Sequence, residues 1–308
     1  MKTFSELKDT YNLPLPDLMF RAARVHREHH DPADVQRCAL LSIKTGGCPE
    51  DCGYCSQSAR YQTGVEATPL LGVAEVKDRA RQAKQLGASR FCMGAAWRGP
   101  KDGPQFESVL EMVREVRALG MEACVTLGML TDDQARRLKD AGLTAYNHNL
   151  DTSRRHYPNV ITTRLYDDRL DTLRAVSRAG ISICCGGILG MNETEDDRLI
   201  LLAELAALDP PPESIPINCL TPIPGTPLEN APTVDSIQLV RLIATTRIAF
   251  PKARVRLSAG RDRMSRELQV LCFLAGANSI FFGEKLLTAP NPAASEDAEL
   301  FRAMGLKT

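Results

Sequence analysis

The 308-residue sequence has no uninterrupted apolar run of the roughly 18 residues that a membrane-spanning helix requires. Its first residues, MKTFSELKDT, form no apolar signal core, and we therefore expect a cytoplasmic protein. The net charge is +0, because 38 Lys and Arg residues balance 38 Asp and Glu residues. This balance excludes a global electrostatic footprint for nucleic acid or for an anionic membrane. Gly/Ser-rich linkers and low-complexity segments are missing as well, and a 44% hydrophobic content rules out wholesale disorder.

Cysteine, in contrast, is abundant, with ten residues in the chain. A reducing cytosol disfavours disulfides, so closely spaced cysteines indicate metal or redox chemistry instead. Cys38 and Cys272 fall on apolar stretches and are expected to be core residues. The remaining cysteines must be interpreted from their positions in the predicted fold.

A repeated unit organises most of the chain. A charged amphipathic stretch ends in Leu-Gly or Ala-Gly, and a short β-rich run follows. Eight such runs are strand candidates, at residues 38–45, 89–96, 122–128, 144–151, 182–189, 214–221, 254–260 and 278–283. Helical patterns separate them, so we predict an α/β fold, a TIM-type (β/α)8 barrel. An open doubly wound sheet is the alternative, because the sequence does not reveal the order of the strands.

Two terminal segments lie outside the repeat. We expect an N-terminal helical extension over residues 1–35, the barrel over residues 36–284, and a C-terminal cap segment over residues 285–308 that ends in one short helix. The extension is predicted to contain a helix over residues 16–30. Three histidines of that helix have helical spacing among charged neighbours and are expected on its solvated face: His26, His29 and His30.

The segment GGCPEDCGYCSQ places Cys48, Cys52 and Cys55 at C-x3-C-x2-C spacing directly after the first strand candidate. In a TIM barrel this is the C-terminal mouth, where active sites are built. Three thiolates on one short loop can hold a soft metal or an iron–sulfur cluster. Three ligands leave one iron of a four-iron cluster open to another ligand. A structural zinc site with a recruited fourth ligand, or three unrelated core cysteines, are the alternatives.

This spacing, with an aromatic residue (Tyr54) before the last cysteine, resembles the radical S-adenosylmethionine (SAM) superfamily. The resemblance implies that Cys48, Cys52 and Cys55 hold a [4Fe-4S] cluster whose open iron chelates SAM. It also implies that an electron from the cluster breaks a C–S bond of SAM and leaves a 5′-deoxyadenosyl radical. Such chemistry requires a chamber that is sealed from water.

Strand alternation adds a second group of residues. Within four strand candidates, Cys92, Cys124, Cys184 and Arg256 each oppose the apolar residues expected to pack on the outer helices. These side chains should therefore point into the barrel. A lumen is normally filled by branched aliphatics, so this composition indicates a reaction chamber. The residues alone leave open a second cluster, catalytic thiols, simple packing, or an arginine paired with a carboxylate or substrate.

Over nearly its whole length the chain resembles the biotin synthase family. The matching stretches include KTGGCPEDCGYCSQSARY, EACVTLG, YNHNLDTS, VRLSAGR and FLAGANSIFFGEKLLTAPNP. The resemblance implies a [2Fe-2S] cluster that is held by Cys92, Cys124, Cys184 and Arg256 and donates sulfur to dethiobiotin. Cys185 departs from the family pattern, but alternation aims it outward. Cys219 departs from it as well and is interpreted as a packing residue.

Polar residues after the fourth strand complete the predicted site. Asn147, Asn149 and Asp151 alternate and should share one face, either to cap a turn or to bind a ligand. Asn218 can offer a donor and an acceptor to a ureido group. The resemblance implies cofactor contacts at Tyr54, Trp97, Asn149, Asp151 and Ile188, and substrate contacts at Asn149 and Asn218. The catalytic residues by the same resemblance are Cys48, Cys52, Cys55 and Arg256.

The resemblance further implies dethiobiotin as substrate, a flavodoxin or ferredoxin type electron donor and a homodimer, with no nucleic acid or membrane partner. One alternative is another radical SAM enzyme, of the lyase or methyl-transfer type, without a sacrificial second cluster. Another is an iron–sulfur carrier or a zinc-stabilised binding module. The polar lumen residues favour a small polar ligand over a simple electron carrier.

Overall fold

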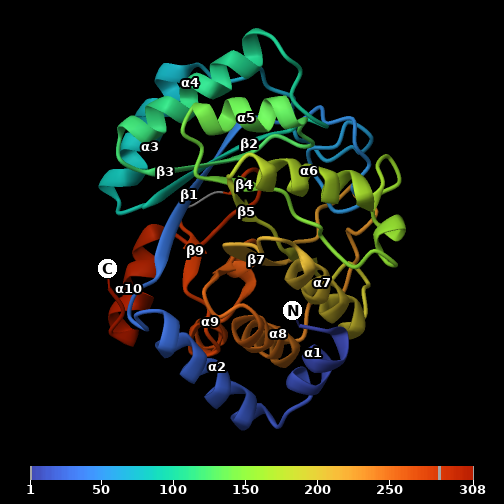
Figure 1. The fold of residues 1–308 in the computed structure, drawn as a ribbon, viewed down its shortest axis with the longest axis vertical. Coiled ribbons are helices and arrows are strands. Elements are labelled where there is room, and N and C mark those ends of the chain that lie inside the picture. Colours follow the sequence, from blue (N-terminus) through green and yellow to red (C-terminus); the bar gives the residue numbers. More distant parts are fainter. Residues whose placement is uncertain (1, 284–285, 308) are drawn as a thin grey trace.

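The computed structural model describes residues 2–283 and 286–307. Its centre is one parallel sheet that closes on itself, in the order β5-β4-β3-β2-β1-β9-β8-β7-β6 with β5 also paired to β7 (Figure 1). The strand segments within the described residues are β1 Gln36–Lys44, β2 Arg90–Ala95, β3 Glu122–Thr126, β4 Ala145–Asn147, β5 Ser182–Cys184, β6 Gly187–Leu189, β7 Ser214–Cys219, β8 Arg254–Leu257 and β9 Ser279–Phe281. A closed ring of parallel strands confirms the predicted barrel and excludes the open doubly wound sheet.

All eight predicted strands are present, but the fifth is interrupted. It divides into β5 and β6 at residues 185–186, and both halves pair with β7. Gly186 lies so close to β7 that a Cβ atom there would be 2.0 Å from the carbonyl oxygen of Pro216. Only glycine permits this approach of two backbones.

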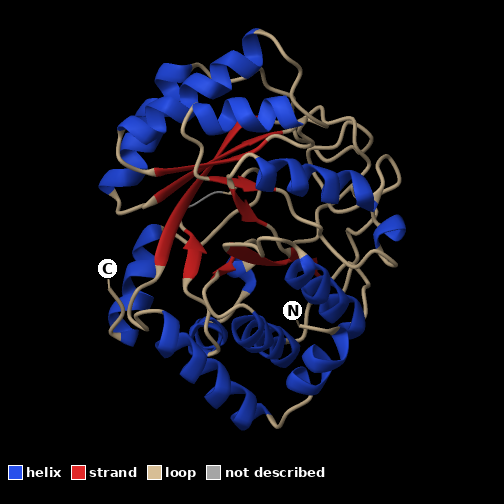
Figure 2. Ribbon diagram, in the orientation of Figure 1, coloured by secondary structure: helices blue, strands red, loops and turns tan. Residues whose placement is uncertain are grey.

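Helices surround the sheet on its outer face, as Figure 2 shows. They are α3 Val73–Gln85, α4 Pro104–Ala118, α5 Asp132–Asp140, α6 Tyr166–Arg178, α7 Glu195–Ala207, α8 Ser236–Ala249 and α9 Arg266–Leu274. Short 3-10 turns occur at Tyr157–Asn159 and Arg261–Arg263. The outward strand side chains, such as Ala123, Val125 and Leu127 of β3 and its following loop, are fully buried beneath the helices. The apolar half of each alternating strand therefore forms the core between sheet and helices.

The terminal segments pack against the outside of the barrel and its helices. Helices α1 (Phe4–Tyr11) and α2 (Leu15–His29) pack against α7 and α8, and in Figure 1 they lie at the bottom beside α8. Helix α10 (Ala294–Met304) is the short helix predicted for the C-terminal end, and its Phe301 packs edge-on against Phe273 of α9 with ring centroids 5.7 Å apart. No helix among the described residues is both long and apolar enough to cross a membrane.

The expected solvated histidine face holds fully only for His29, which is exposed. His26 is buried where α2 packs on α8, and His30 is half-buried with its Nε2 3.1 Å from the Pro251 carbonyl oxygen. Burial, reinforced by the nearby cation of Arg247, lowers the pKa of His26 to about 4. The charged sequence around His26 conceals this contact, because a helix of this length has a buried stripe even when most of its residues are polar.

A buried arginine forms two ion pairs with partly exposed carboxylates at the amino-terminal ends of the strands. Arg90, at the start of β2, is 1% exposed, and its Nε donates to Glu122 Oε2 at 2.8 Å. Its Nη2 donates to Glu213 Oε2 at 3.0 Å, just before β7 begins. The guanidinium thus spans the lower end of the barrel and joins strands on opposite sides of it.

Candidate active site

A chamber of about 350 Å³ lies inside the barrel toward the carboxyl ends of the strands. This size is in the range of small-molecule sites. Among the residues predicted from sequence, its wall contains Cys48, Cys52, Tyr54, Cys55, Cys92, Trp97, Cys124, Asn149, Asp151, Ile188, Asn218 and Arg256. Cys184, the remaining predicted residue, is fully buried and contacts both Arg256 and Asn147. The structure therefore brings all of the predicted residues to one chamber.

The cysteine loop begins with two glycines in left-handed backbone conformation, which residues with a Cβ atom rarely adopt. Gly46 and Gly47 have φ of 68° and 69°, and they turn the chain back over the end of β1. The loop then holds itself together: Cys48 N–H donates to Gln57 at 3.0 Å, and Cys55 N–H donates to Cys52 at 2.9 Å, both to backbone oxygens. Backbone bonds thus give the three cysteines a defined arrangement.

A second set of contacts ties this loop to the segment before α6. The Asp51 carboxylate accepts the backbone N–H groups of Thr162 and Thr163 at 3.0 and 3.1 Å. Partial burial works against ionisation, but these hydrogen bonds outweigh it and lower the pKa of Asp51 to about 2. Glu50 is buried and pairs with Arg98 at 2.6 Å. The cysteine loop is therefore fastened to neighbouring loops by the carboxylates of Asp51 and Glu50.

The three loop cysteines are partly or fully shielded from water. Cys52 is 5% exposed, whereas Cys48 and Cys55 are half-buried. Burial raises the pKa of each thiol, and it raises that of Cys55 to about 12. Arg164 Nη2 donates to Cys52 Sγ at 3.4 Å and provides a nearby positive charge. Thiols in such a setting become thiolates when a metal binds them.

The second group of cysteines lies deeper in the barrel. Cys92 and Cys124 are direct partners in the β2–β3 register, and Cys184 is paired with Asn147 between β4 and β5. These three cysteines are 0–3% exposed. A hydrogen bond between Cys92 and Cys124 raises the pKa of Cys92 and lowers that of Cys124. Strand alternation correctly predicted that each of them points inward.

Arg256 of β8 completes this deeper group. It is fully buried, and its Nε donates to Ser279 Oγ at 2.9 Å. Its Nη1 reaches Cys184 Sγ at 3.6 Å, and its Nη2 reaches Gln36 Oε1 at 3.4 Å. Among the described residues no carboxylate forms an ion pair with it, so the alternative of an arginine paired with a protein carboxylate does not hold.

A buried guanidinium is costly, by several kcal/mol for a single ion, unless its surroundings compensate the charge. Arg256 has neutral acceptors in Ser279 and Gln36 and lies over the Phe281 ring at 4.9 Å, and an anionic partner would stabilise it further. Burial works to lower the pKa of Arg256, but the surrounding thiols of Cys38, Cys184 and Cys92 raise it as they ionise. The residues present therefore fit an anionic, thiolate-bound group at this position. An arginine facing three buried cysteines is a chemically suitable setting for an iron–sulfur cluster.

Ligation of a single ion is not supported. Within residues 2–283 and 286–307, no group of three or more His, Cys, Asp or Glu side chains converges on one metal position. A structural zinc site requires such convergence. Cysteines that each bind a different iron of a cluster do not share one point, so this finding weighs against the zinc alternative and not against a cluster.

The polar residues after β4 face the chamber together, as predicted. Asn147 Nδ2 donates to Asn149 Oδ1 at 3.1 Å, and Asn149 Oδ1 also accepts the Gly186 N–H at 3.2 Å. Asp151 has a φ of 67° and is 2% exposed, and its Oδ2 accepts hydrogen bonds from Tyr54 and Arg169. Only part of each side chain is thus committed to the protein.

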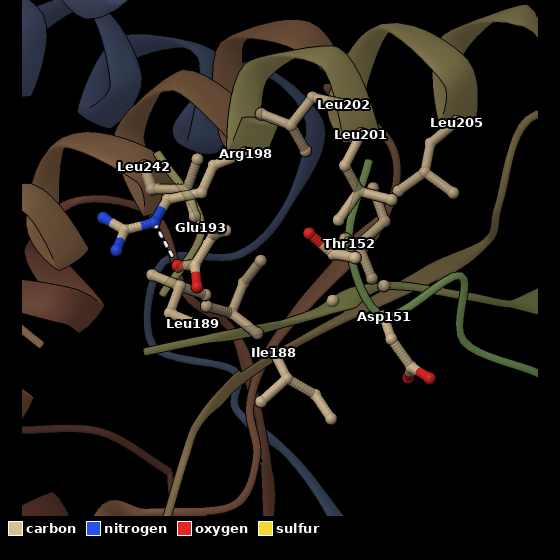
Figure 3. A pocket seen from close by; sticks show the side chains of 14 residues that line it. Asp151, Thr152, Ile188, Leu189, Glu193, Arg198, Leu201, Leu202, Leu205 and Leu242 are labelled. Carbon is tan, nitrogen blue, oxygen red and sulfur yellow. Dashed lines mark hydrogen bonds and ion pairs between the residues drawn. The ribbon is translucent and has the colours of Figure 1, made fainter. Parts of the chain in front are cut away.

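At Asp151, where φ is 67°, the chain turns so that the side chains of Asp151 and Thr152 point in different directions (Figure 3). The Asp151 carboxylate points away from the leucines of α7, whereas Thr152 stands on the α7 side. The cavity drawn there measures about 10 Å³, which is space for one water at most. Its wall is largely apolar, apart from the Glu193–Arg198 ion pair at 2.7 Å, and it is a packing gap beside the chamber.

Asn218 lies on the opposite wall, on β7. Its Nδ2 donates to the Gly187 carbonyl at 3.0 Å, and its Oδ1 accepts the Ala259 N–H at 3.2 Å. An amide has two N–H donors and two acceptor lone pairs, so one of each remains for a ligand. The backbone bonds fix the direction in which the remaining pair points.

The structure adds chamber residues to which the sequence analysis gave no role. His148 lies between two predicted site residues, where alternation would turn it away, but β4 ends at Asn147 and alternation ends with it. Its buried Nε2 and the buried Thr221 Oγ1 have no protein hydrogen-bond partner among the described residues. Arg164 and Arg169 also line the wall. Their sequence signal, an arginine shortly after the polar motif, is too weak to single out.

Two further cysteines are core residues, as the sequence predicts, and both also lie near the chamber. Cys219 packs against the main core and is half-buried on the chamber wall. Cys38 is fully buried and clusters with Cys92 and Cys124. Cys185 points outward as predicted, into the core that contacts α6.

Comparisons with known proteins agree with this geometry. Residues 42–205 match the family model of the radical SAM superfamily, and residues 216–307 match the Biotin and Thiamin Synthesis associated domain. A biotin synthase from Gloeobacter violaceus is 62% identical over 305 residues, which cover 99% of this chain and 96% of the relative. A biotin synthase from Methylobacterium nodulans is 61% identical, with coverage of 99% and 92%.

Solved structures with the same fold are more distant in sequence. Methylornithine synthase superposes with a TM-score of 0.84 at 18% identity, covering 99% of this chain and 93% of that one. The FeFe-hydrogenase maturase HydG from Carboxydothermus hydrogenoformans gives a TM-score of 0.85 at 18% identity, with coverage of 99% and 75%. These likenesses establish the fold alone.

Proposed function

The chain belongs to the biotin synthase family, and from this membership we propose that it inserts one sulfur atom between two saturated carbons of dethiobiotin to form biotin. It is a radical SAM enzyme, and the family implies an iron–sulfur cluster and SAM as cofactors. Overall, the substrate loses two hydrogen atoms and gains one sulfur atom.

We propose that the two cysteine groups hold two different clusters. Cys48, Cys52 and Cys55 would hold a [4Fe-4S] cluster, and the deeper group would hold a [2Fe-2S] cluster through Cys92, Cys124, Cys184 and Arg256. When bound, the first supplies the electron that cleaves SAM, and the second supplies the sulfur. The observation that carries this proposal is the pair of separate three-cysteine groups on one chamber, one of them facing a buried arginine without a carboxylate partner.

The other chamber residues bind and orient small molecules in this proposal. Asn149, Asp151 and Ile188 would contact the SAM nucleoside, and Tyr54 holds the Asp151 carboxylate in place through its hydrogen bond at 2.8 Å. Trp97 would place backbone near the methionine part of SAM. Asn149 and Asn218 would direct the ureido ring of dethiobiotin, since each has an amide group facing the chamber. Apolar walls exclude the water that would compete for a reactive carbon.

We also propose the assembly and partners of the chain from the family. It would act as a homodimer and take electrons from a flavodoxin or ferredoxin type donor. We propose a division into an extension over residues 1–35, a barrel over residues 36–284 and a cap over residues 285–308. Helices α1 and α2 in front of β1, and α10 after β9, support this division.

The test compares one cysteine from each group in anaerobic, reconstituted protein. Cys52→Ala is expected to abolish both 5′-deoxyadenosine and biotin, because the radical-generating group is lost. Cys184→Ala is expected to retain SAM cleavage while biotin formation stops. Cys272→Ala, which alters a buried cysteine outside both groups, is the matched control. If Cys184→Ala still made biotin at the rate of the control, the deeper group would not be the sulfur source.

A second candidate is a radical SAM enzyme without a sacrificial cluster. Iron and sulfide contents that match a single four-iron cluster in fully reconstituted protein would favour it. The deep position of Arg256 among three cysteines favours the two-cluster proposal, because one cluster at the loop leaves this cation without an anionic partner.

A further inference from the structure

The amide oxygen of Gln36 is the acceptor around which the contacts of Arg256 are organised. Gln36, the first residue of β1, places its Oε1 within hydrogen-bond distance of Arg256 Nη2 at 3.4 Å and of Ser279 Oγ at 3.1 Å. The Cys38 thiol also donates to this oxygen, at 3.5 Å. Three donors therefore converge on a single acceptor that is itself 9% exposed.

The orientation of this amide is determined by its other end. Gln36 Nε2 donates to Glu122 Oε2 at 3.1 Å, and the same carboxylate accepts Arg90 Nε at 2.8 Å. A carboxylate can only accept hydrogen bonds, so the amide nitrogen must face Glu122. The amide oxygen must then face Arg256, and a flipped amide would set two N–H donors against a guanidinium.

The strand register explains why these side chains meet. Gln36 is paired with Ser279 between β1 and β9, and Ser279 is paired with Arg256 between β9 and β8. Three neighbouring strands thus present inward side chains at one level of the barrel. Gln36 and Ser279 occupy Nη2 and Nε of the guanidinium, which leaves Nη1 directed at Cys184.

We propose that Gln36 is a positioning residue, which fixes the guanidinium of Arg256 as a ligand of the deeper cluster. This inference rests on the proposed function, since it assigns the cluster to that group. Gln36 itself does not touch the cluster; it acts through Arg256. Its amide is in turn oriented by Glu122, which also pairs with Arg90. Side-chain contacts therefore connect Arg90, at the amino-terminal end of β2, to Arg256 through Glu122 and Gln36.

The experiment compares Gln36→Leu with Gln269→Leu in anaerobically reconstituted, full-length protein. Gln269 is a matched control: it is 8% exposed, and its Oε1 accepts hydrogen bonds from a buried arginine, Arg261, at 3.0 and 3.3 Å. That pair lies outside the chamber wall. Both variants lose a buried amide that holds a guanidinium, so they share any general loss of stability.

Two readouts report on the cluster itself. One is the absorption and electron paramagnetic resonance signature of the [2Fe-2S] cluster, and the other is its rate of release to a chelator. In Gln36→Leu we expect an altered signature and release faster by about tenfold, because a hydrogen bond to a charged group is worth roughly that factor. Gln269→Leu is expected to retain the wild-type signature and release rate.

Exchanging the two side chains provides a rescue. Gln36→Glu combined with Glu122→Gln keeps an acceptor toward Arg256 and restores the amide–carboxylate hydrogen bond in the opposite direction. We expect the double variant to recover the wild-type signature. Gln36→Leu with an unchanged signature and release rate would overturn the inference, and so would equal losses in Gln36→Leu and Gln269→Leu.

Failure of the proposed function is recognised separately. If wild-type protein binds only one cluster, the two-cluster proposal fails, and the positioning role is then measured without metal. Hydrogen exchange at the Arg256 Nη2 group, which donates to Gln36, is followed by nitrogen NMR; it is expected to accelerate about tenfold in Gln36→Leu and to stay unchanged in Gln269→Leu. Equal exchange in all three proteins would refute the positioning role on its own terms.

Discussion

A single added methyl group at Gly186 is expected to damage the deeper half of the chamber. The Cβ of Gly186→Ala would lie 2.0 Å from the Pro216 carbonyl oxygen, far inside the 3.4 Å at which ordinary contact begins. The backbone at Gly186 is not left-handed, so the substitution tests steric conflict and not a forbidden φ. Because the obstacle is backbone on β7, it cannot rotate away as a side chain would.

The magnitude follows from the cost of overpacking. Inserting an atom into a packed site typically costs about 1–3 kcal/mol, and a clash with backbone belongs near the upper end of that range. In a chain of this size about 3 kcal/mol corresponds to a fall in Tm on the order of 5 °C or more. Relief requires β5 and β7 to separate, which moves Cys184 away from Arg256, whose strand β8 is paired with β7.

Thermal unfolding followed by circular dichroism, together with iron content after reconstitution, measures both effects. Gly72→Ala is the control, since Gly72 has a φ of −72° and no atom within 4 Å of an added Cβ. Its position at a helix N-cap limits the cost of that change to about 1 kcal/mol. If Gly186→Ala were as stable as Gly72→Ala and bound as much iron, the close contact of β5 with β7 would be refuted.

Three further results are expected. Asp51→Ala removes the acceptor that ties the cysteine loop to the segment before α6. The free energy of unfolding in chemical denaturation should fall by about 1–2 kcal/mol, and proteolysis within residues 45–72 should become faster. An unchanged rate of digestion would contradict the proposed tether. His26 stays neutral when folded because burial, then Arg247, lowers its pKa to about 4, whereas it titrates near 6.5 when unfolded. The free energy of unfolding should therefore fall between pH 6.5 and 4, and His26→Leu should make that fall less steep in urea titrations. Part of the fall should remain, because burial also lowers the pKa of His30, to about 4, and that of His148. Asn218→Leu should raise the KM for dethiobiotin about tenfold in steady-state assays, and an unchanged KM would exclude a substrate contact there.

The barrel was predictable because its signals are local. Each strand candidate lies between a helix-ending glycine and a turn, and strand alternation then placed Cys92, Cys124, Cys184 and Arg256 inward without knowledge of the strand order. A period of two residues separates the faces of a strand unambiguously. The cysteine loop was equally accessible, because its three residues lie within eight positions of one another.

Other features depend on contacts between distant segments. Gln36 gives no sequence signal, since its role arises from a register that joins β1, β9 and β8. Cys38 was expected in an ordinary core because its neighbours are apolar, yet it shares the interior of the barrel with Cys92 and Cys124. His148 was missed because strand alternation stops where β4 ends, and the direction of a loop side chain has no such rule.

The two groups of cysteines differ in how far they lie from solvent. Cys92, Cys124 and Cys184 are 0–3% exposed, whereas Cys48 and Cys55 of the loop are half-buried. If the deeper group gives up its sulfur in each reaction, as proposed, then any reagent that restores the sulfur must reach side chains that water barely contacts. Rebuilding the deeper site therefore requires either a small reagent or a local opening of the barrel, whereas the loop can be rebuilt from the surface.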